Sequence, residues 1–301
     1  WLVPAGALEG AHAVIHCAAD DTAHEPLGRA VNEEGTAALA RAALAAGVRA
    51  FVLVSSSSAR PDAPSVYGRT KHGAEAALGK VAGLDAVIVR PGLITGPGKR
   101  GLYRRMCATV DRLPFLPLLG GGRFPVQPVH ADDLCDALVA AAERADALAG
   151  RVFRLGSPVP VTLADFMSEL SLARRGRRLA RIPIPLAPLE AAVALAERAG
   201  LRLPVSGSNL RGMRSAATMD TVGDMKELGV PVRTLSELVR MGEDAAAEDP
   251  PPGRRAVRVL LAGAGRMGII HCGNLARARG AVLCGIADPK PSARGMLRGI
   301  G

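Results

Sequence analysis

Short, unbroken apolar runs alternate with helical stretches along the first third of the chain, and this alternation constrains the fold more than any other feature. The apolar runs are residues 13–16, 51–54 and 86–89, and the helical pattern lies between them, over 31–46 and 65–80. Strands that are apolar throughout are typical of a parallel sheet covered by helices on both faces. The sequence therefore predicts an α/β fold with a doubly wound parallel sheet.

The composition favours a globular protein and excludes several classes. Of the 301 residues, 49% are apolar and 22% are charged, which is enough for a large core and excludes a disordered chain. The 38 basic and 28 acidic residues leave a net charge of +10, but only 3% of residues are aromatic and the arginines are scattered. This charge indicates a compositional bias, so we expect no nucleic-acid partner. No apolar run approaches the roughly 20 residues that span a bilayer, so we expect no membrane partner and a cytoplasmic location.

Neither the cysteines nor the beginning of the chain indicates secretion. The five cysteines are odd in number and form no C-x-x-C pair and no cluster with histidines at metal-ligand spacing, so no disulfide framework and no metal site are expected. Residue 1 is Trp, and no charged-then-apolar leader is present. We expect the chain to be an internal piece of a longer protein.

Residues that can do chemistry follow the predicted strands, at the edge where parallel sheets bind ligands. The small residues Ala18 and Ala19 follow the first strand, and four serines, 55–58, follow the second. Tyr67 and Lys71 come next, one helical turn apart on one face. A lysine ammonium beside a phenol favours the phenolate and is expected to lower the pKa of the tyrosine, which could then act as acid or base. By itself such a pair more often lies on a solvated helix face, and its context favours the catalytic interpretation.

These motifs, in this order, resemble the extended short-chain dehydrogenase/reductase family, which includes nucleotide-sugar epimerases and dehydratases and 3-beta-hydroxysteroid dehydrogenases. The resemblance covers about residues 5 to 245. It rests on AVIHCAAD (13–20), VNEEGT (31–36), GVRAFVLVSSSS (47–58), YGRTK (67–71), VRPGLITGPG (89–98), VHADDL (129–134) and LGSPVPVTLADF (155–166). It implies a Rossmann-like sheet, NAD or NADP as cofactor, and hydride exchange with a secondary alcohol or ketone, such as a sugar, a nucleotide sugar or a sterol-like molecule.

The same resemblance implies roles for individual residues. Tyr67 would be the acid/base, and Lys71 would modulate its pKa and bind the cofactor ribose. Ser56 would be the hydroxyl partner, with Ser57 as the alternative because the register within four serines is ambiguous. Asn32 would be a proton-relay or strand-spacing residue, and a structural role as a local backbone cap is an equal alternative.

The cofactor site and two departures from the family pattern also follow from the resemblance. Ala18, Ala19, Pro91 and Leu93 would lie at the cofactor, together with Lys71. Leu93 stands where many sugar-nucleotide enzymes have Asn, and Thr95 stands where they have Tyr, which favours a less polar alcohol as substrate. The family's first strand, glycine-rich loop and first helix should precede residue 1. Without that loop, we expect the chain to hold a cofactor poorly.

From about residue 162 the sequence resembles the small, α-rich substrate cap of the extended enzymes. The arginine cluster 174–178 is interpreted as a solvated helix end, with contact to an anionic substrate as the alternative. His130 is expected to be a structural turn residue, and Asp132 and Asp133 are expected to cap the helix that follows them.

A change in composition predicts a second unit after the first domain, which spans residues 1–241. Residues 242–255 are acidic and rich in proline, as in a linker, and an apolar run at 256–261 follows. Within 256–301 the motif Gly263, Gly265 and Gly268 opens a helix, and Asp288 follows a further strand. These four residues are expected to bind a dinucleotide. The segment looks like the start of the glucose-fructose oxidoreductase and inositol dehydrogenase family, and so of a second, partial Rossmann unit.

Three functional hypotheses follow. The first is an NAD(P)-dependent oxidoreductase or epimerase acting on a small-molecule substrate, with a homodimer as a possible assembly. The second is a non-catalytic dinucleotide-binding or assembly module, or an inactive fragment of a bifunctional fusion oxidoreductase. The third, ranked last because its glycine spacing is tighter than the short-chain family's, is a circular rearrangement in which residues 256–301 dock as the missing first strand, loop and helix.

Overall fold

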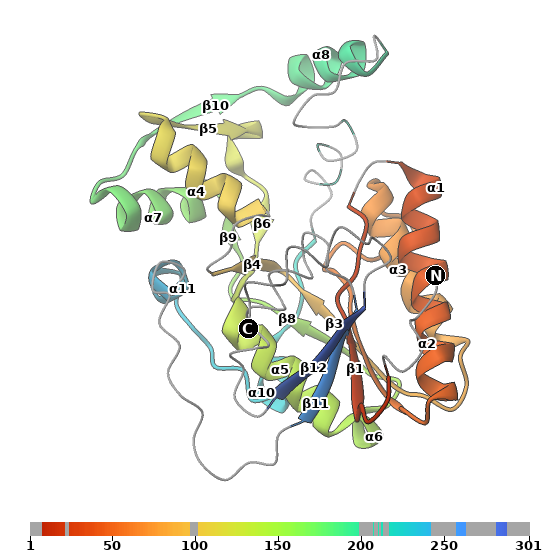
Figure 1. Cartoon of the computed structure of the whole chain (residues 1–301). Coiled ribbons are helices and arrows are strands. Elements are labelled where there is room, and N and C mark those ends of the chain that lie inside the picture. Colours follow the sequence, from red (N-terminus) through yellow and green to blue (C-terminus); the bar gives the residue numbers. More distant parts are fainter. Residues whose placement is uncertain are drawn as a thin grey trace.

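The computed structural model describes residues 8–21, 24–96, 102–198, 207, 210, 212 and 217–241, and the backbone of 257–262 and 281–287. Its main sheet is formed by β1 (Ala13–His16), β2 (Ala50–Val54), β3 (Asp85–Pro91), β8 (Val152–Leu155), β11 (Val257–Ala262) and β12 (Ala281–Ala287). The strand order is β12-β11-β1-β2-β3-β8, and all neighbouring strands are parallel (Figure 1). The predicted parallel sheet and its first three strands are confirmed.

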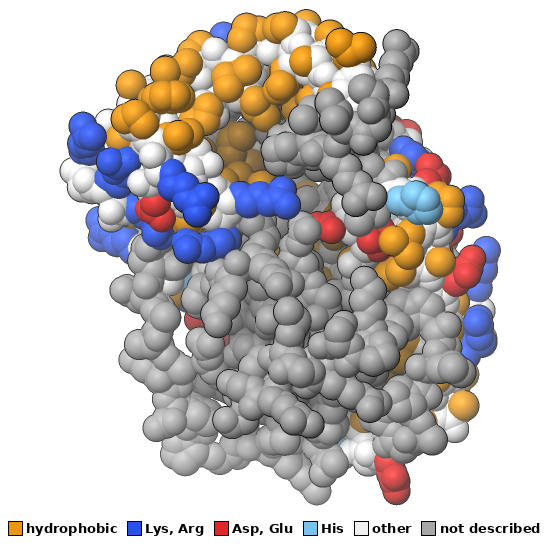
Figure 2. Space-filling view, turned by 45° about the horizontal axis from the view of Figure 1, so that its top comes forward, with side chains coloured by type: hydrophobic (Ala, Val, Ile, Leu, Met, Phe, Trp, Pro, Cys, Tyr) orange, Lys and Arg blue, Asp and Glu red, His pale blue; other side chains and the backbone are white. Residues whose placement is uncertain are grey.

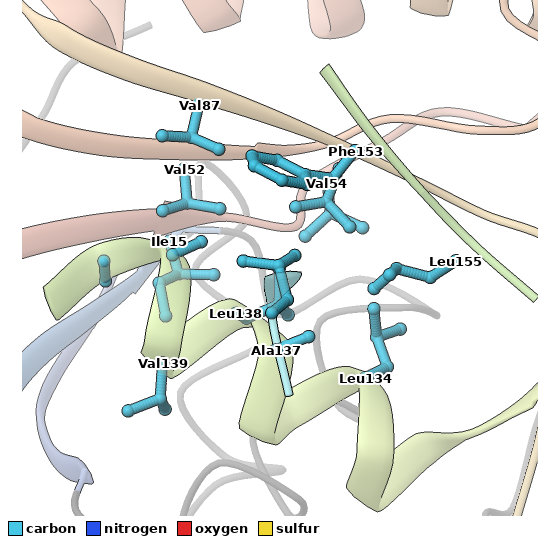
Figure 3. Packing of buried hydrophobic residues seen from close by; sticks show 14 of the residues in the cluster. Ile15, Val52, Val54, Val87, Leu134, Ala137, Leu138, Val139, Phe153 and Leu155 are labelled. Carbon is cyan, nitrogen blue, oxygen red and sulfur yellow. The ribbon is translucent and has the colours of Figure 1, made fainter. Parts of the chain in front are cut away.

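Helices cover both faces of this sheet, as its apolar strands require. One face carries η1 (Arg29–Glu34, π-helical), α2 (Gly35–Ala45) and α3 (Val66–Gly79), with α1 (Glu25–Gly28) beside them, and the other carries α5 (Ala131–Glu143), α6 (Ala145–Leu148) and α10 (Val222–Glu227). Side chains alternate between the faces. Val14 and Phe51 pack with α2 and α3, whereas Ile15 and Val52 pack with α5 (Figure 3). α2 ends at Ala45, and Gly47, two residues later, has the left-handed φ of +77° that favours glycine.

The start of α5 differs from its prediction. His130, not Asp132 or Asp133, is the N-cap, and its imidazole accepts a hydrogen bond from the backbone N–H of Asp132 at 3.3 Å. The Asp133 carboxylate accepts two hydrogen bonds from Arg233, at 2.6 and 2.7 Å. The pattern D-D before an apolar run could not show this, because Arg233 lies far along the chain.

A smaller layer sits beyond the carboxyl ends of the sheet strands. Its elements are β4 (Leu93–Thr95), α4 (Leu102–Arg112), β5 (Phe115–Leu119), η2 (Gly120–Gly122), β6 (Pro125–Val126), β7 (Pro128–His130), β9 (Val161–Thr162), α7 (Leu163–Arg175), β10 (Ala180–Ile184), α8 (Leu186–Arg198) and α11 (Leu235–Met241). We call this layer the cap. The cap was predicted to start at about residue 162. Its apolar core already includes Tyr103, because α4 packs against α7, so the cap starts well before that residue. Apolar side chains and arginines share its surface (Figure 2). None of the described helices has the length and apolar character needed to cross a bilayer.

The strands of the C-terminal segment belong to the same sheet as the rest of the chain. β11 pairs with β1 in parallel, and β12 pairs with β11 at the edge. The linker 242–255 lies outside the described residues. A separate domain that begins at residue 256 stays a prediction. The strand pairing favours the third hypothesis, in which residues 256–301 dock beside the first strand of the sheet.

We expect Leu138→Ala to lower the free energy of unfolding by about 2–5 kcal/mol, because it removes buried methyl groups and leaves a cavity. Leu138 of α5 has no exposed surface and packs in the cluster that contains Phe153 and Leu155 (Figure 3). The matched control is Leu195→Ala, also in a helix but with 70% of the side chain exposed, which should change stability by less than about 0.5 kcal/mol. Urea unfolding of the two variants tests the packing, and equal losses would contradict it.

Candidate functional site

A cavity of about 390 Å³ opens where the carboxyl ends of β1, β2 and β3 meet the cap. Its walls include these predicted site residues: Ala19, Ser56, Tyr67, Lys71, Pro91 and Leu93. Ser57 also lines it, whereas Ala18 and Asn32 do not. Gly263, Gly265, Gly268 and Asp288 lie outside the described residues, so their role in cofactor binding stays a prediction.

The beginning of α3 brings Tyr67 to the end of β2. The hydroxyl of Ser65 caps the helix by accepting a hydrogen bond from the backbone N–H of Gly68 at 3.1 Å. Gly68 has no side chain, and a Cβ there would lie 2.6 Å from the carbonyl oxygen of Ser58. This close approach holds the helix start against the serine-rich loop, where the Ser56 hydroxyl lies close enough to the phenol of Tyr67 to influence its pKa. The contact favours Ser56 over Ser57 as the hydroxyl partner.

The pKa of Tyr67 differs from its prediction. Its pKa is raised from 10 to about 12, mainly by burial and also by the carboxylate of Asp21, against a smaller opposing effect of the Ser56 hydroxyl. The prediction that Lys71 lowers the pKa of Tyr67 is wrong. The Lys71 ammonium donates to the carbonyl oxygen of Val54 at 2.6 Å, so its strongest partner is the strand end and not the phenol.

Lys71 is 1% exposed, and burial of its charge lowers its pKa from 10.5 to about 8. The neighbouring Cys17 and Glu75 oppose this shift. Burial also raises the pKa of the Cys17 thiol to about 12, so this cysteine is a buried thiol beside the lysine. At neutral pH the site therefore holds a protonated phenol and an ammonium whose pKa lies about one unit above that pH.

A buried ion-pair network lies beside Lys71, and the sequence did not predict it. Glu75 lies one turn after Lys71 on α3 and is 7% exposed. Its carboxylate accepts hydrogen bonds from Arg90 at 2.8 and 2.5 Å and from the hydroxyl of Ser55 at 2.5 Å. The network joins α3 to the ends of β2 and β3. Its sequence signal was a carboxylate four residues after Lys71 together with the arginine of the R-P-G motif.

Asn32 is buried and ties the end of β1 to α3. Its side-chain oxygen accepts a hydrogen bond from the backbone N–H of Asp20 at 2.7 Å, and its amide nitrogen donates to the Asp20 carbonyl at 3.0 Å and to the Thr70 hydroxyl at 2.8 Å. These three hydrogen bonds hold the chain after β1 against α3, which is a structural role. Of the roles considered for Asn32, the geometry favours strand spacing over proton relay.

The arginine cluster lies away from the cavity. Arg174 forms two hydrogen bonds with Asp111 at 2.8 and 2.9 Å, and Arg178 pairs with Glu169 at 2.9 Å. Arg175 donates to backbone carbonyls of α4 and the loop that follows it. These contacts favour the helix-end interpretation over contact with a substrate. In the part of the chain that the structure describes, no three metal-ligating side chains lie together.

Comparison with known proteins gives relatives for most of this chain. UDP-glucose 4-epimerase from Vibrio cholerae is 29% identical over 207 residues, which are 60% of this chain and 62% of that protein. Ceramide reductase from Caulobacter vibrioides is 39% identical over 136 residues, which are 44% of this chain and 41% of that protein. The chain thus spans less than two thirds of the length of these relatives.

Solved structures share the fold. The human epimerase family protein SDR39U1, solved with NADPH, aligns with a TM-score of 0.63 at 20% identity over 80% of this chain and 85% of that chain. The dTDP-glucose 4,6-dehydratase DesIV from Streptomyces venezuelae, solved with NAD, aligns with a TM-score of 0.57 at 21% identity over 78% and 74% of the two chains. The Rossmann-like α/β fold is therefore confirmed.

The family match covers residues 5–156, from before β1 to the end of β8, and so includes Ser56, Tyr67 and Lys71. The family is NAD-dependent, which confirms at family level the expected cofactor, NAD or NADP. The chain belongs to the NAD dependent epimerase/dehydratase family.

Proposed function

We propose that this chain catalyses NAD(P)-dependent interconversion of a secondary alcohol and a ketone, with Tyr67 as acid/base, Ser56 as its hydroxyl partner and Lys71 as the supporting cation. The observation that carries the proposal is that Ser56, Tyr67 and Lys71 line one cavity at the carboxyl end of a parallel sheet. Ligands of doubly wound sheets bind at this edge. A homodimer stays a prediction.

The residues of the cavity fit the nicotinamide and ribose end of a dinucleotide. Ala19 leaves room beside the end of β1, Pro91 and Leu93 provide apolar surface after β3, and Lys71 provides a positive charge and a hydrogen-bond donor. A bound nicotinamide supplies or accepts the hydride. The protein residues orient the substrate and move its proton.

Burial determines which proton transfer is favoured at neutral pH. The phenol of Tyr67, whose pKa is raised, is protonated at neutral pH and can donate its proton to the oxygen of a ketone that is being reduced. Ser56 can hold the same oxygen, since its hydroxyl already lies at the phenol. Oxidation of an alcohol requires the phenolate, so its rate should rise with pH.

The cap side of the cavity favours a substrate with an apolar body. Leu93, Ile94, Ala217 and Met219 line it, Arg104 and Gln127 are its charged and amide-bearing members, and Thr95 is buried, with its hydroxyl near the backbone carbonyl of Val129. This agrees with the loss of the Asn and Tyr that many sugar-nucleotide enzymes have here. The relatives are named for a nucleotide sugar in one case and for a lipid in the other. The apolar residues that line the cavity favour the less polar of these two substrate classes.

Tyr67→Phe should lower kcat about 10²- to 10³-fold and change the Kd for NADH by less than about threefold, because it removes the transferred proton and little volume. NADH oxidation with a long-chain aliphatic ketone and with UDP-4-keto-glucose as probes measures the first quantity, and fluorescence titration measures the second. Tyr103→Phe is the matched comparison: Tyr103, the chain's other tyrosine, lines the cap side of the same cavity and packs against Phe166, so this variant removes a phenol hydroxyl of the cavity that is not assigned to proton transfer. Unchanged turnover of Tyr67→Phe would contradict the proposal, and NADH binding without turnover of either probe would favour a non-catalytic module.

The lowered pKa of Lys71 makes stability depend on pH in a defined direction. Between about 8 and 10.5 the unfolded chain retains the lysine proton that the folded chain has released, so the free energy of unfolding rises with pH. From about pH 7 to pH 9, this group should add about 1 kcal/mol.

The Lys71→Met chain should not show this rise in the free energy of unfolding with pH. The Lys80→Met chain, changed at the exposed end of the same helix, should still show it. Urea unfolding of the full chain at both pH values measures the difference. An equal pH dependence in wild type and Lys71→Met would show that the lysine is not buried as described.

A further inference from the structure

We propose that the cap binds peripherally to the surface of a membrane that contains anionic lipids, through the outer surface of β10 and α8 and the arginines beside it. We call the exposed surface of residues 182–195 the apolar patch. The sequence analysis expected no membrane partner because no segment is long enough to span a bilayer, and the described helices agree with that reason. Peripheral binding requires no spanning segment, because an apolar helix face can lie in the plane of the membrane surface.

The apolar patch exposes apolar side chains where a solvated surface normally exposes polar ones. Ile182 is 44% exposed and Leu195 is 70% exposed. The one charged residue between 182 and 195, Glu190, is half-buried. A surface helix usually presents charged or polar residues to water, so the exposed side of α8 is suited to an apolar environment. All exposed residues of this stretch are apolar: Ile182, Pro183, Pro185, Ala187, Pro188, Ala191, Ala192, Ala194 and Leu195.

Arginines adjoin the apolar patch and make the cap positively charged. Residues 102–130 and 161–198, which contain most of the cap, include ten arginines, five acidic residues and no lysine. Arg177, Arg178 and Arg181 directly precede the patch and are exposed. The last two each pair with one carboxylate, whereas Arg177 has no ion-pair partner among the described residues. Lys and Arg side chains border the hydrophobic surface of the cap (Figure 2). This combination is complementary to a bilayer with anionic lipids.

Two features favour a bilayer over a second protein as the occupant of the patch. β10 forms a two-stranded sheet with β5, and it contains Pro183 and is followed by Pro185. Prolines protect a strand edge from pairing with another chain. Residues 182–195 also contain no aromatic side chain, whereas the centres of protein interfaces are enriched in aromatic residues. Small and aliphatic side chains need no shape-matched partner in a fluid bilayer.

The patch also agrees with the substrate class favoured for the cavity, and this step rests on the proposed function. Leu93, Ile94 and Met219 line the cap side of the cavity, which suits a substrate with an apolar body. Such a substrate would be concentrated in a bilayer. Membrane binding through the cap would hold one wall of the cavity close to that source.

Flotation of the full chain with vesicles tests the inference. The wild-type chain should bind vesicles of phosphatidylcholine mixed with phosphatidylserine about tenfold or more tightly than vesicles of phosphatidylcholine alone. Leu195→Glu places a charge on the apolar patch and should weaken binding to the mixed vesicles about tenfold or more. The matched control is Val222→Glu, on α10 away from the cap (Figure 1), where the side chain is 56% exposed. It should change binding by less than about twofold, because a distant exposed charge is screened by salt.

A second pair of variants tests the role of charge. Arg177→Ala should weaken binding to the mixed vesicles about fivefold, which is the effect of one cation at an anionic membrane surface. Arg41→Ala removes an exposed arginine from α2, on a face of the sheet away from the cap, and should change binding by less than about twofold.

Three results would overturn the inference. The first is a wild-type chain that floats with neither kind of vesicle or equally with both. The second is equal binding of the wild-type and Leu195→Glu chains. The third is a wild-type dimer that Leu195→Glu converts to a monomer in sedimentation velocity, because a second copy would then cover the patch.

Failure of this inference can be distinguished from failure of the proposed function, because vesicle binding does not require turnover. Tyr67→Phe should bind the mixed vesicles as the wild-type chain does. Loss of turnover in Tyr67→Phe, together with a wild-type chain that binds no vesicles, would refute this inference and leave the proposed catalytic site intact. Vesicle binding with unchanged turnover in Tyr67→Phe would do the reverse.

Discussion

Burial of both faces of the central strands is the constraint on which the rest of the structure depends. In β1, Val14 and Ile15 are both fully buried and point to opposite sides, so helices must cover both. Because α2 and α3 take one face and α5 takes the other, the carboxyl ends of the strands are left as the edge where a cavity opens beneath the cap. Polar and charged groups of the site gather at this edge.

The same burial determines the protonation states of the site. An environment with little water disfavours charge. The pKa of the Tyr67 phenol is therefore raised, and the pKa of the Lys71 ammonium is lowered. Glu75 and Arg90 offset the cost of a buried lysine by placing a paired carboxylate one turn away. The arrangement is ready to protonate a ketone at neutral pH and needs higher pH, or a nearby positive charge, to accept a proton from an alcohol.

Local patterns predicted most of the sheet, both of its early helices and the neighbourhood of Tyr67 and Lys71, because strand and helix periodicity and the four-residue spacing are properties of short segments. The pKa of Tyr67 could not be predicted in this way, since it depends on burial by parts of the chain far from residue 67. The partner of Asp133 was missed, and the pairing of β11 with β1 was ranked last among the hypotheses, for a related reason. Both join residues that are far apart in sequence, and no local period specifies such contacts.

The most direct measurement is an ultraviolet titration of the Tyr67 phenol in the Tyr103→Phe chain, where Tyr67 is the one remaining tyrosine. At a pH of about 10, where an ordinary tyrosine is half ionised, we expect Tyr67 to remain protonated in the free chain. Saturating NAD⁺ should move its ionisation to lower pH, because the nicotinamide brings a positive charge into the same cavity. A phenol that ionises like free tyrosine, or whose titration is unchanged by NAD⁺, would contradict the account.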